Sequence, residues 1–344
     1  MVAPLSQNPL DRARLSIDAA RAAERRDAPD DALARYDEAL KLLEGLEPAE
    51  LLADALRWKG TVHRERGETE EARVLYARSA AIADTLGYRA GKAHALNCLA
   101  AVAQRRGDMA EAERLYRLAA LVGAEAGDQR LLGMIQQNLG ILANIRGDLD
   151  EALRRYRMSL RAYEAAGDDQ TAALTWNNLG MLHTDCGEFI EAELAYERAI
   201  AIANRRGDVH VARAVGLNRI ELLIAVARWA EADEHCSRAL DAAERRRDRA
   251  RRAEALKFLG VIERNRRQYD RAADALAEAR GLATECGDVL LSAELLSELG
   301  ETWCLRGDAR EACAAWEEAA TVFERVGAKP NARALRGRVA ELRA

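Results

Sequence analysis

The chain has 344 residues, of which 49% are hydrophobic and 32% charged, and its formal net charge is −5. This near balance of charge argues against the strongly basic face that general nucleic-acid binding requires, and no run of residues is apolar enough to span a bilayer. One core rarely serves so long a chain, so the length favours several domains or a solenoid that grows by stacking. We expect no nucleic-acid partner and no membrane partner.

The N-terminal segment 1–10 has no apolar core of the signal-peptide type, and we expect it to be disordered in a cytoplasmic protein. The six cysteines are scattered without a CxxC pair, which favours buried, reduced thiols over a metal site. The motifs HExxH, GxSxG and GxxxxGK[ST] are absent as well. We therefore predict no metal, no cofactor and no enzymatic activity. The alanine-rich, arginine-rich and lysine-poor composition is typical of a GC-rich bacterial genome.

From residue 11 to residue 326 the chain repeats every forty residues, in eight units that share one register without an insertion. A glycine column recurs in five of the units: Gly60, Gly140, Gly180, Gly260 and Gly300. Twelve residues later an unbroken alanine column follows: Ala32, Ala72, Ala112, Ala152, Ala192, Ala232, Ala272 and Ala312. Small residues in fixed columns permit the close approach of two helix backbones, so the period predicts a stack of helix pairs.

Four residues beyond the alanines lies a column of larger side chains: Tyr36, Tyr76, Tyr116, Tyr156, Tyr196, Cys236, Leu276 and Trp316. We expect these side chains to fill the space that the small residues leave. Gly-Asp and Gly-Glu pairs, such as Gly147-Asp148 and Gly187-Glu188, divide each unit into two helices. Glycine suits the left-handed residue that ends a helix, and aspartate caps the next one. Each helix should have about 17 residues and a length of roughly 25 Å.

Two units depart from the pattern at their internal turn, where Ala227-Arg228-Trp229 and Arg267-Gln268-Tyr269 replace Gly-Asp-apolar. Trp229 and Tyr269 keep the apolar position, so we expect the fold to survive there. The linker Arg246–Arg249 also lacks its glycine, and we expect a continuous or bent helix at that junction. After the eighth unit, segment 327–344 should form one more helix, from Ala332 to Leu342, that caps the stack with a polar outer face.

At these columns the chain resembles the tetratricopeptide repeat family. One unit shows the likeness best, with Asn178-Leu179-Gly180, then Gly187, Glu191-Ala192, Tyr196 and Ala199-Ile200. Two features differ: the period is forty instead of the usual thirty-four, and the proline that often ends the second helix is missing. Both features are similar to the long-repeat branch found in kinesin light chains, polarity adaptors and bacterial peptide-sensing regulators. The resemblance implies an all-α, right-handed solenoid of eight antiparallel helix pairs plus a C-terminal capping helix.

In this family the first helix of each pair lines a concave groove, so the resemblance places a ligand against those helices. Side-chain amides recur there although asparagine is a mediocre helix former, at Asn97, Gln137, Asn138, Asn177, Asn178 and Asn218. Amides donate and accept hydrogen bonds, so such a row could hold the backbone of an extended peptide. The alternative is that the amides bond one another between helices and bind nothing.

An apolar floor could accompany the amides if Met134, Ile141, Leu174, Met181 and Leu217 are exposed, although such residues are more often core. Early units add Arg57, Arg64 and Arg105, and late units add Glu221, Glu298 and Glu301. Nearby opposite charges dilute both sets. A remaining gradient would orient a ligand with its acidic stretch toward the N-terminal end and its basic stretch toward the C-terminal end.

The function predicted from these features is a scaffold or adaptor that binds a peptide or a partner protein segment. The alternative is a regulatory peptide sensor that changes its superhelical pitch, or the repeat fragment of a larger regulator. Sensors of this type usually carry a second module, for which this chain leaves no room, and this favours the adaptor unless the chain is a fragment. We expect a monomer, or weak self-association through the open ends of the solenoid.

Overall fold

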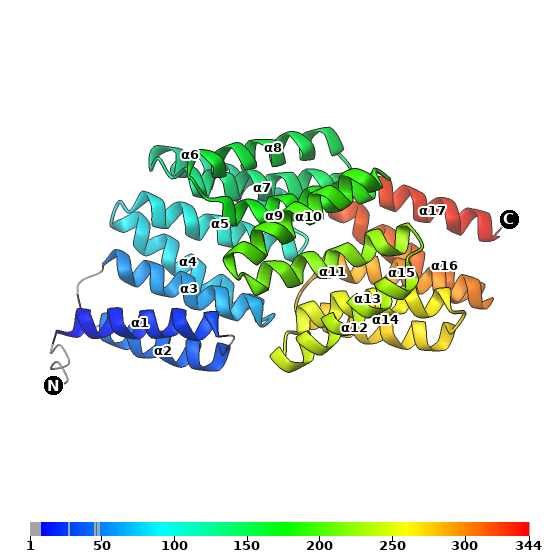
Figure 1. Cartoon of the computed structure of the whole chain (residues 1–344), viewed down its shortest axis with the longest axis horizontal. Coiled ribbons are helices and arrows are strands. Elements are labelled where there is room, and N and C mark those ends of the chain that lie inside the picture. Colours follow the sequence, from blue (N-terminus) through cyan, green and yellow to red (C-terminus); the bar gives the residue numbers. More distant parts are fainter. Residues whose placement is uncertain (1–7, 27, 45, 47–48, 344) are drawn as a thin grey trace. The chain divides into compact units, whose positions relative to one another are not determined.

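The computed structural model describes residues 8–26, 28–44, 46 and 49–343, and this part of the chain contains seventeen α-helices and no strand (Figure 1). The prediction of an all-α solenoid of eight helix pairs and a closing helix is confirmed. The bounds of the helices in the first four pairs are α1 Pro9–Arg25, α2 Pro29–Leu43, α3 Glu50–Glu65, α4 Thr69–Thr85, α5 Arg89–Arg105, α6 Met109–Glu125, α7 Gln129–Arg146 and α8 Leu149–Ala165. The other helices are α9 Asp169–Asp185, α10 Phe189–Arg206, α11 Val209–Ala225, α12 Trp229–Arg246, α13 Arg249–Asn265, α14 Tyr269–Glu285, α15 Val289–Arg306, α16 Ala309–Arg325 and α17 Lys329–Arg343.

The helices belong to two compact units. Unit 1 comprises Met1–Val102 and Arg114–Leu131, and unit 2 comprises Ala103–Glu113 and Leu132–Ala344. Residues 1–7, most of the segment that we expected to be disordered, lie outside the described residues. The first helix begins at Pro9, where the Asn8 side chain accepts a hydrogen bond from the Leu10 amide. Residues 9 and 10 are therefore helical.

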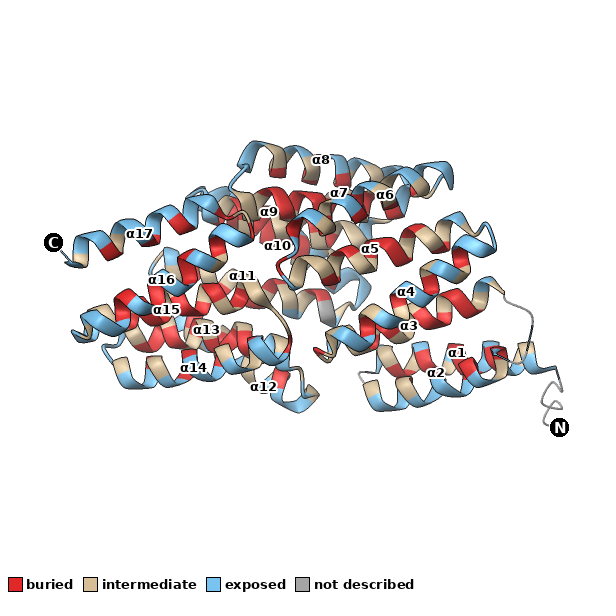
Figure 2. Cartoon of the chain, turned by 180° about the vertical axis from the view of Figure 1, so that it is seen from behind, coloured by how far each residue is buried: buried red, intermediate tan, exposed pale blue. Residues whose placement is uncertain are grey.

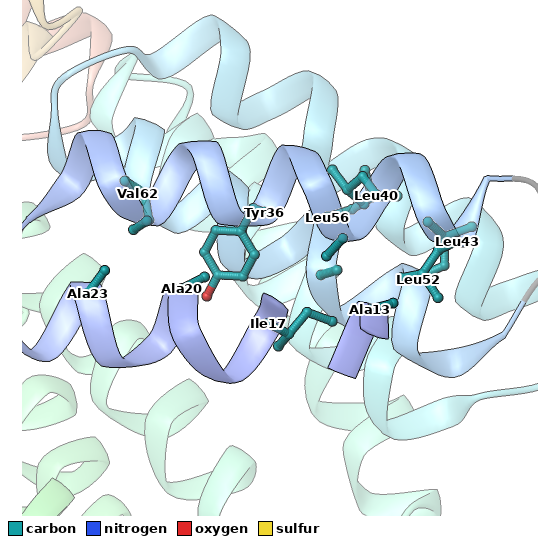
Figure 3. Close-up of a cluster of buried hydrophobic side chains, with 13 residues drawn as sticks. Ala13, Ile17, Ala20, Ala23, Tyr36, Leu40, Leu43, Leu52, Leu56 and Val62 are labelled. Atoms are coloured by element: carbon teal, nitrogen blue, oxygen red, sulfur yellow. The ribbon is translucent and has the colours of Figure 1, made fainter. Parts of the chain in front are cut away.

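Unit 1 begins with a core of small and branched residues between α1, α2 and α3 (Figure 3). Ala20 of α1 has no exposed surface, and Tyr36 of α2 is buried among the aliphatic side chains of this cluster. Leu40 and Leu56 extend the cluster toward the other end of the helix pair. A core made of alanine and leucine around one tyrosine is what the repeat columns predict for this unit.

Unit 2 contains a layer of first helices, in which α9 contacts α11, α11 contacts α13 and α13 contacts α15. The second helices α10, α12, α14 and α16 each pack against the first helices before and after them in the chain. Buried residues lie on the facing sides of these helices, and exposed residues lie on the outer sides (Figure 2). The amide positions of α9 and α11 therefore belong to one continuous layer.

The glycine and large-residue columns meet inside each of the five pairs that have a glycine in this column. A Cβ atom on Gly180 would lie 2.6 Å from Cε1 of Tyr196, and one on Gly300 would lie 2.5 Å from Cδ1 of Trp316. Such distances are shorter than van der Waals contact, so a larger residue would force the helices apart. All eight alanines of the alanine column have no exposed surface. The columns thus mark the closest contacts between paired helices, as the sequence predicted.

The turns between units are closed by a left-handed residue and an aspartate. Gly207 has φ 67°, and the side chain of Asp208 accepts a hydrogen bond of 3.0 Å from the Val211 amide at the start of α11. Asp168 and Asp288 cap α9 and α15 in the same way. These caps satisfy amide groups that the first turn of a helix leaves without a partner.

The prediction of a continuous or bent helix at Arg246–Arg249 is wrong. Helix α12 ends at Arg246, Arg247 adopts φ 53°, and Asp248 caps α13. The amides of Arg247 and Asp248 donate to carbonyl groups of the last turn of α12, which is the usual hydrogen bonding after a left-handed residue. The turn therefore keeps the same geometry without glycine, as it does at Ala227 with φ 58° and at Arg267 with φ 61°.

Arg247→Gly should stabilise the protein, because a residue with a Cβ atom pays a steric cost in the left-handed region that glycine avoids. We expect the free energy of unfolding to rise by about 1 kcal/mol, less the entropy that glycine gains in the unfolded chain. Urea denaturation followed by circular dichroism would measure the change. Arg246→Gly, one residue earlier and inside α12, is the matched control and should destabilise the protein.

The closing helix α17 covers the end of the last pair with Ala332, Leu335 and Val339, all of which are buried. Arg338 of α17 lies over the Trp316 ring, 4.4 Å from its centroid, and forms an ion pair with Glu301 of α15. The arginines of this helix thus contact the acidic side chains of the pair beneath it, which fits the predicted capping role.

Candidate ligand-binding surface

The amides of α9 carry hydrogen-bonding atoms without partners. Asn177 is only 4% exposed, and its Nδ2 donates to the Oδ1 atom of Asn178 at 3.4 Å and contacts the Met181 sulfur at 3.9 Å. In the described part of the chain, neither Oδ1 of Asn177 nor Nδ2 of Asn178 has a hydrogen-bond partner. A buried amide atom without a partner costs free energy, so these two atoms favour a partner from outside the chain.

The neighbouring amides behave differently from the α9 pair. Gln137 of α7 is 8% exposed, and its Oε1 accepts hydrogen bonds from Thr175 at 3.0 Å and from Tyr163 at 3.5 Å. These bonds connect α7 to α9 and to α8, so they give Gln137 a role inside the helix stack. Asn138 of α7 and Asn218 of α11 are half-buried in the same column as Asn178. The Tyr196 hydroxyl donates to the backbone oxygen of Asn218 at 3.4 Å.

The residues expected to form an apolar floor separate into two groups. Met134, Ile141, Leu174 and Met181 are partly buried and keep some exposed surface. Leu217 is 4% exposed and belongs to a core cluster with Ile220 and Phe258, so it cannot contact a ligand. The predicted floor residues that keep exposed surface therefore all lie on α7 and α9.

Two of the acidic residues predicted for the late units, Glu221 and Glu298, interact electrostatically with Lys257 of α13. Its ammonium group lies 2.7 Å from Glu294 of α15, and Arg264 lies 2.7 Å from Glu298. Burial lowers the pKa of Lys257, but Glu294 and Glu221 raise it, and the net shift is upward. Lys257 is therefore a cation held by several carboxylates, and removing it would leave those carboxylates uncompensated.

Glu221→Gln should stabilise the folded protein at neutral pH. Burial raises the pKa of Glu221, with Lys257 opposing this shift. A raised folded-state pKa gives stability that is complete below the unfolded value and is lost as the pH rises through the folded value. The gain from the substitution should therefore be largest at neutral pH and vanish below the ordinary pKa of a glutamate. Thermal unfolding of both proteins across this pH range would test it, and an equal gain at every pH would contradict it.

Three of the predicted positions belong to unit 1. Arg57 of α3 forms a 2.9 Å ion pair with Asp54 and lies over the Trp58 ring, 5.3 Å from its centroid. Arg64 lies on the same helix, and Asn97 of α5 is 5% exposed. These residues share a unit with one another but not with the α9 amides.

The other two charged positions are engaged within unit 2. Arg105 lies 3.8 Å from Asp288, and the Glu301 carboxylate pairs with Arg338 of the closing helix.

Sequence reasoning did not select Asp185, which accepts a 3.1 Å hydrogen bond from Asn144. The sequence contains a pattern that could have identified Asp185. It follows Asn177 and Met181 at intervals of four residues and so shares their face of α9.

The described residues lack two kinds of feature. Within residues 8–26, 28–44, 46 and 49–343, no group of three or more histidine, cysteine, aspartate or glutamate side chains is placed to hold a metal ion. Over the same residues, no helix has the length and apolar character needed to cross a membrane.

The fold and the surface define an all-α helical-repeat protein with a layer of first helices that carries amide side chains. Comparison with family models identifies the repeat: residues 91–165 and 173–206 match two models described as tetratricopeptide repeat. The resemblance predicted from the sequence columns is thus confirmed. A search of the curated proteins found no match.

Solved structures with the same fold have low sequence identity to this chain. The Rap conjugation gene regulator of plasmid pLS20, in complex with the Phr* peptide, has a TM-score of 0.67 at 16% identity, with 83% of this chain and 78% of that chain covered. A Rap protein complexed with competence and sporulation factor has a TM-score of 0.59 at 13% identity, covering 97% and 98%. Cut9 in the APC/C hetero-tetramer Cut9-Hcn1 has a TM-score of 0.64 at 17% identity, covering 95% of this chain and 57% of that one. This chain thus spans little more than half of the Cut9 chain.

Proposed function

We propose that this chain is a non-catalytic scaffold that holds a peptide, or an extended segment of a partner protein, against the first helices of unit 2. The observation that carries the proposal is the α9 amide pair, in which Asn177 Oδ1 and Asn178 Nδ2 are buried without a hydrogen-bond partner in the described part of the chain. One is an acceptor and the other a donor, so together they match the amide and carbonyl groups of a peptide backbone.

The surroundings of the pair support a ligand of this kind. Asn138 and Asn218 occupy the same column on the helices before and after α9, which would extend the contact along a peptide. Met134 and Met181 add flexible apolar surface that tolerates varied side chains. The similar Rap structures, each of which is a complex with a peptide or factor, have the same fold and are compatible with such a role.

The test compares the wild type with a variant in which Asn138, Asn178 and Asn218 are all replaced by alanine. Both proteins, once shown to have equal helicity and melting temperature, would be probed with a microarray of random short peptides. We expect the variant to lose most of the wild-type binding, since each amide contributes hydrogen bonds to the peptide backbone. Asn204→Ala, at an exposed position on α10, is the matched control and should bind as the wild type does. Equal binding by all three proteins would contradict the proposal.

A sensor role is favoured by contacts between repeats that are not neighbours in the chain. Arg105 pairs with Asp288, and a Cβ atom on Gly107 would lie 3.1 Å from Cγ1 of Val289 and 3.0 Å from Cγ1 of Val326. Repeats of a solenoid ordinarily contact only their neighbours, so these contacts could respond to a change of pitch. Small-angle scattering with and without a bound peptide separates the roles, because a sensor changes its radius of gyration and an adaptor does not.

A further inference from the structure

Helix α10 differs from the other second helices on its exposed face. Ile190 is 74% exposed and Leu194 is 52% exposed, and the two side chains lie one helical turn apart. No other unit has large apolar residues at both of these positions, where the pairs are Asp30/Ala34, Glu70/Val74, Ala110/Arg114, Asp150/Arg154, Ala230/Glu234, Asp270/Asp274 and Arg310/Ala314. The other seven units fold without such a pair, so the apolar residues of α10 are available for a contact outside the chain.

The charges along the same face of α10 are separated by sign. Glu191 and Glu197 are exposed in the first part of the helix, and neither forms an ion pair with a described residue. Arg205 is exposed in the last turn and also has no acidic partner among the described residues. Arg198, between them, lies over the Trp176 ring, 4.6 Å from its centroid. One helix face therefore has an acidic N-terminal half and a basic C-terminal half.

Such a face is complementary to its own copy when the two helices run antiparallel. With a twofold axis between Glu197 and Arg198, the glutamate of each copy lies beside the arginine of the other. Glu191 then lies within one residue, or about 1.5 Å along the helix, of Arg205 in the second copy. The symmetry forms both acid–arginine pairs twice. A parallel arrangement would instead place acid against acid and arginine against arginine.

We propose that the exposed face of α10 binds the same face of a second copy of this chain, in an antiparallel helix pair with twofold symmetry. Leu194 of each copy then lies opposite Ala201 of the other, an exposed residue whose small side chain leaves room for it. Ile190 lies against the methylene groups of Arg205 in the other copy. The inference is independent of the proposed peptide binding, because the amides lie on the first helices and α10 is a second helix.

The size and symmetry of this contact determine what kind of association it forms. Stable specific interfaces usually bury about 1,600 Å² in total, and a contact along one helix buries less, so the dimer should be weak. Both halves of a twofold contact are used when two copies meet, so the assembly stops at the dimer. Contacts through the open ends of a solenoid would use different surfaces, because α10 has α9 and α11 packed against it within unit 2.

The experiment measures the mass of the full chain by sedimentation equilibrium, from micromolar to millimolar concentrations. Two variants reverse one half of the face each. The basic variant is Glu191→Arg/Glu197→Arg, and the acidic variant is Arg198→Glu/Arg205→Glu. Each variant alone opposes like charges and should dimerise at least tenfold more weakly than the wild type. An equimolar mixture of the two restores every acid–arginine pair and should form a heterodimer with about the wild-type affinity.

Two further variants separate the contact from general effects of charge and folding. Asp241→Arg/Glu244→Arg makes the charge change of the basic variant at exposed positions of α12 and should dimerise as the wild type does. Leu194→Gln changes no charge and should weaken the dimer, which tests the contact even if the substitution of Arg198 disturbs its packing on Trp176. A wild type that is monomeric at every concentration would overturn the proposal, and so would a dimer that survives in Leu194→Gln and in the basic variant. Neither result affects the proposed peptide binding.

Discussion

Tyr196→Ala should lower the free energy of unfolding by about 3 to 5 kcal/mol, the range seen when a large buried aromatic residue is truncated. The ring has no exposed surface and packs directly on the backbone of α9 at Gly180. No side chain at Gly180 can move in to fill the space, so the cavity should persist between α9 and α10. Urea denaturation of the purified chain would give the change.

Two companion variants separate packing from hydrogen bonding at Tyr196. Tyr196→Phe removes only the hydroxyl, whose bond to the Asn218 carbonyl is long at 3.4 Å, so it should cost far less than the alanine variant. Tyr269→Ala is the matched control, because Tyr269 is half-buried at the first position of α14 and leaves a smaller cavity. Equal losses for Tyr196→Ala and Tyr269→Ala would mean that the column contact does not hold the pair together.

Lys257→Met should destabilise the protein by roughly 2 to 4 kcal/mol at neutral pH, because it leaves Glu294 and Glu221 without their nearest cation. The lysine side chain is only 18% exposed, so water compensates little for its loss. The raised pKa of Lys257 agrees with a stabilising role for its charge. Its contribution to stability is complete below the ordinary pKa of a lysine and is lost only as the pH rises through the folded-state pKa. Neutral pH therefore shows the full effect in a urea titration.

The loss in Lys257→Met should shrink as the pH falls, because protonation removes the repulsion between the remaining carboxylates. The double variant Lys257→Met/Glu294→Gln should recover part of the stability at neutral pH for the same reason. If the loss is the same at acidic and neutral pH, and the second substitution recovers nothing, the lysine does not act through its charge.

The repeat columns allowed the fold to be predicted because each helix pair meets the same steric demand. Gly180 beside Tyr196 and Gly300 beside Trp316 are the same contact made with different large residues. The turn at Arg247 was mispredicted because local preference favours glycine there, whereas the packing of the flanking helices imposes the left-handed conformation. The local preference for glycine can be read from a single sequence, whereas the packing of the flanking helices cannot.

The surface could be predicted only in outline. Asparagine inside a helix has a visible cost, and this identified the column of Asn138, Asn178 and Asn218. Whether an amide is satisfied depends on partners far away in the chain. Thr175, thirty-eight residues after Gln137, supplies the donor that gives Gln137 an interior role, and nothing equivalent among the described residues reaches the Asn177 oxygen. The pairing of the acids with Lys257 and Arg264 likewise required the arrangement of the helices.

The constant register of the repeat columns has a consequence for how such a chain changes over time. Gly140 contacts Tyr156 as Gly180 contacts Tyr196, so the contact between the two helices of a pair is the same in these units. Among the five units that have this glycine, a forty-residue block could therefore be duplicated or lost by recombination while the contact between paired helices stays the same. Residues on the exposed side of the first helices take no part in these contacts between paired helices. Length and specificity can thus evolve separately, the first in whole blocks and the second by single substitutions.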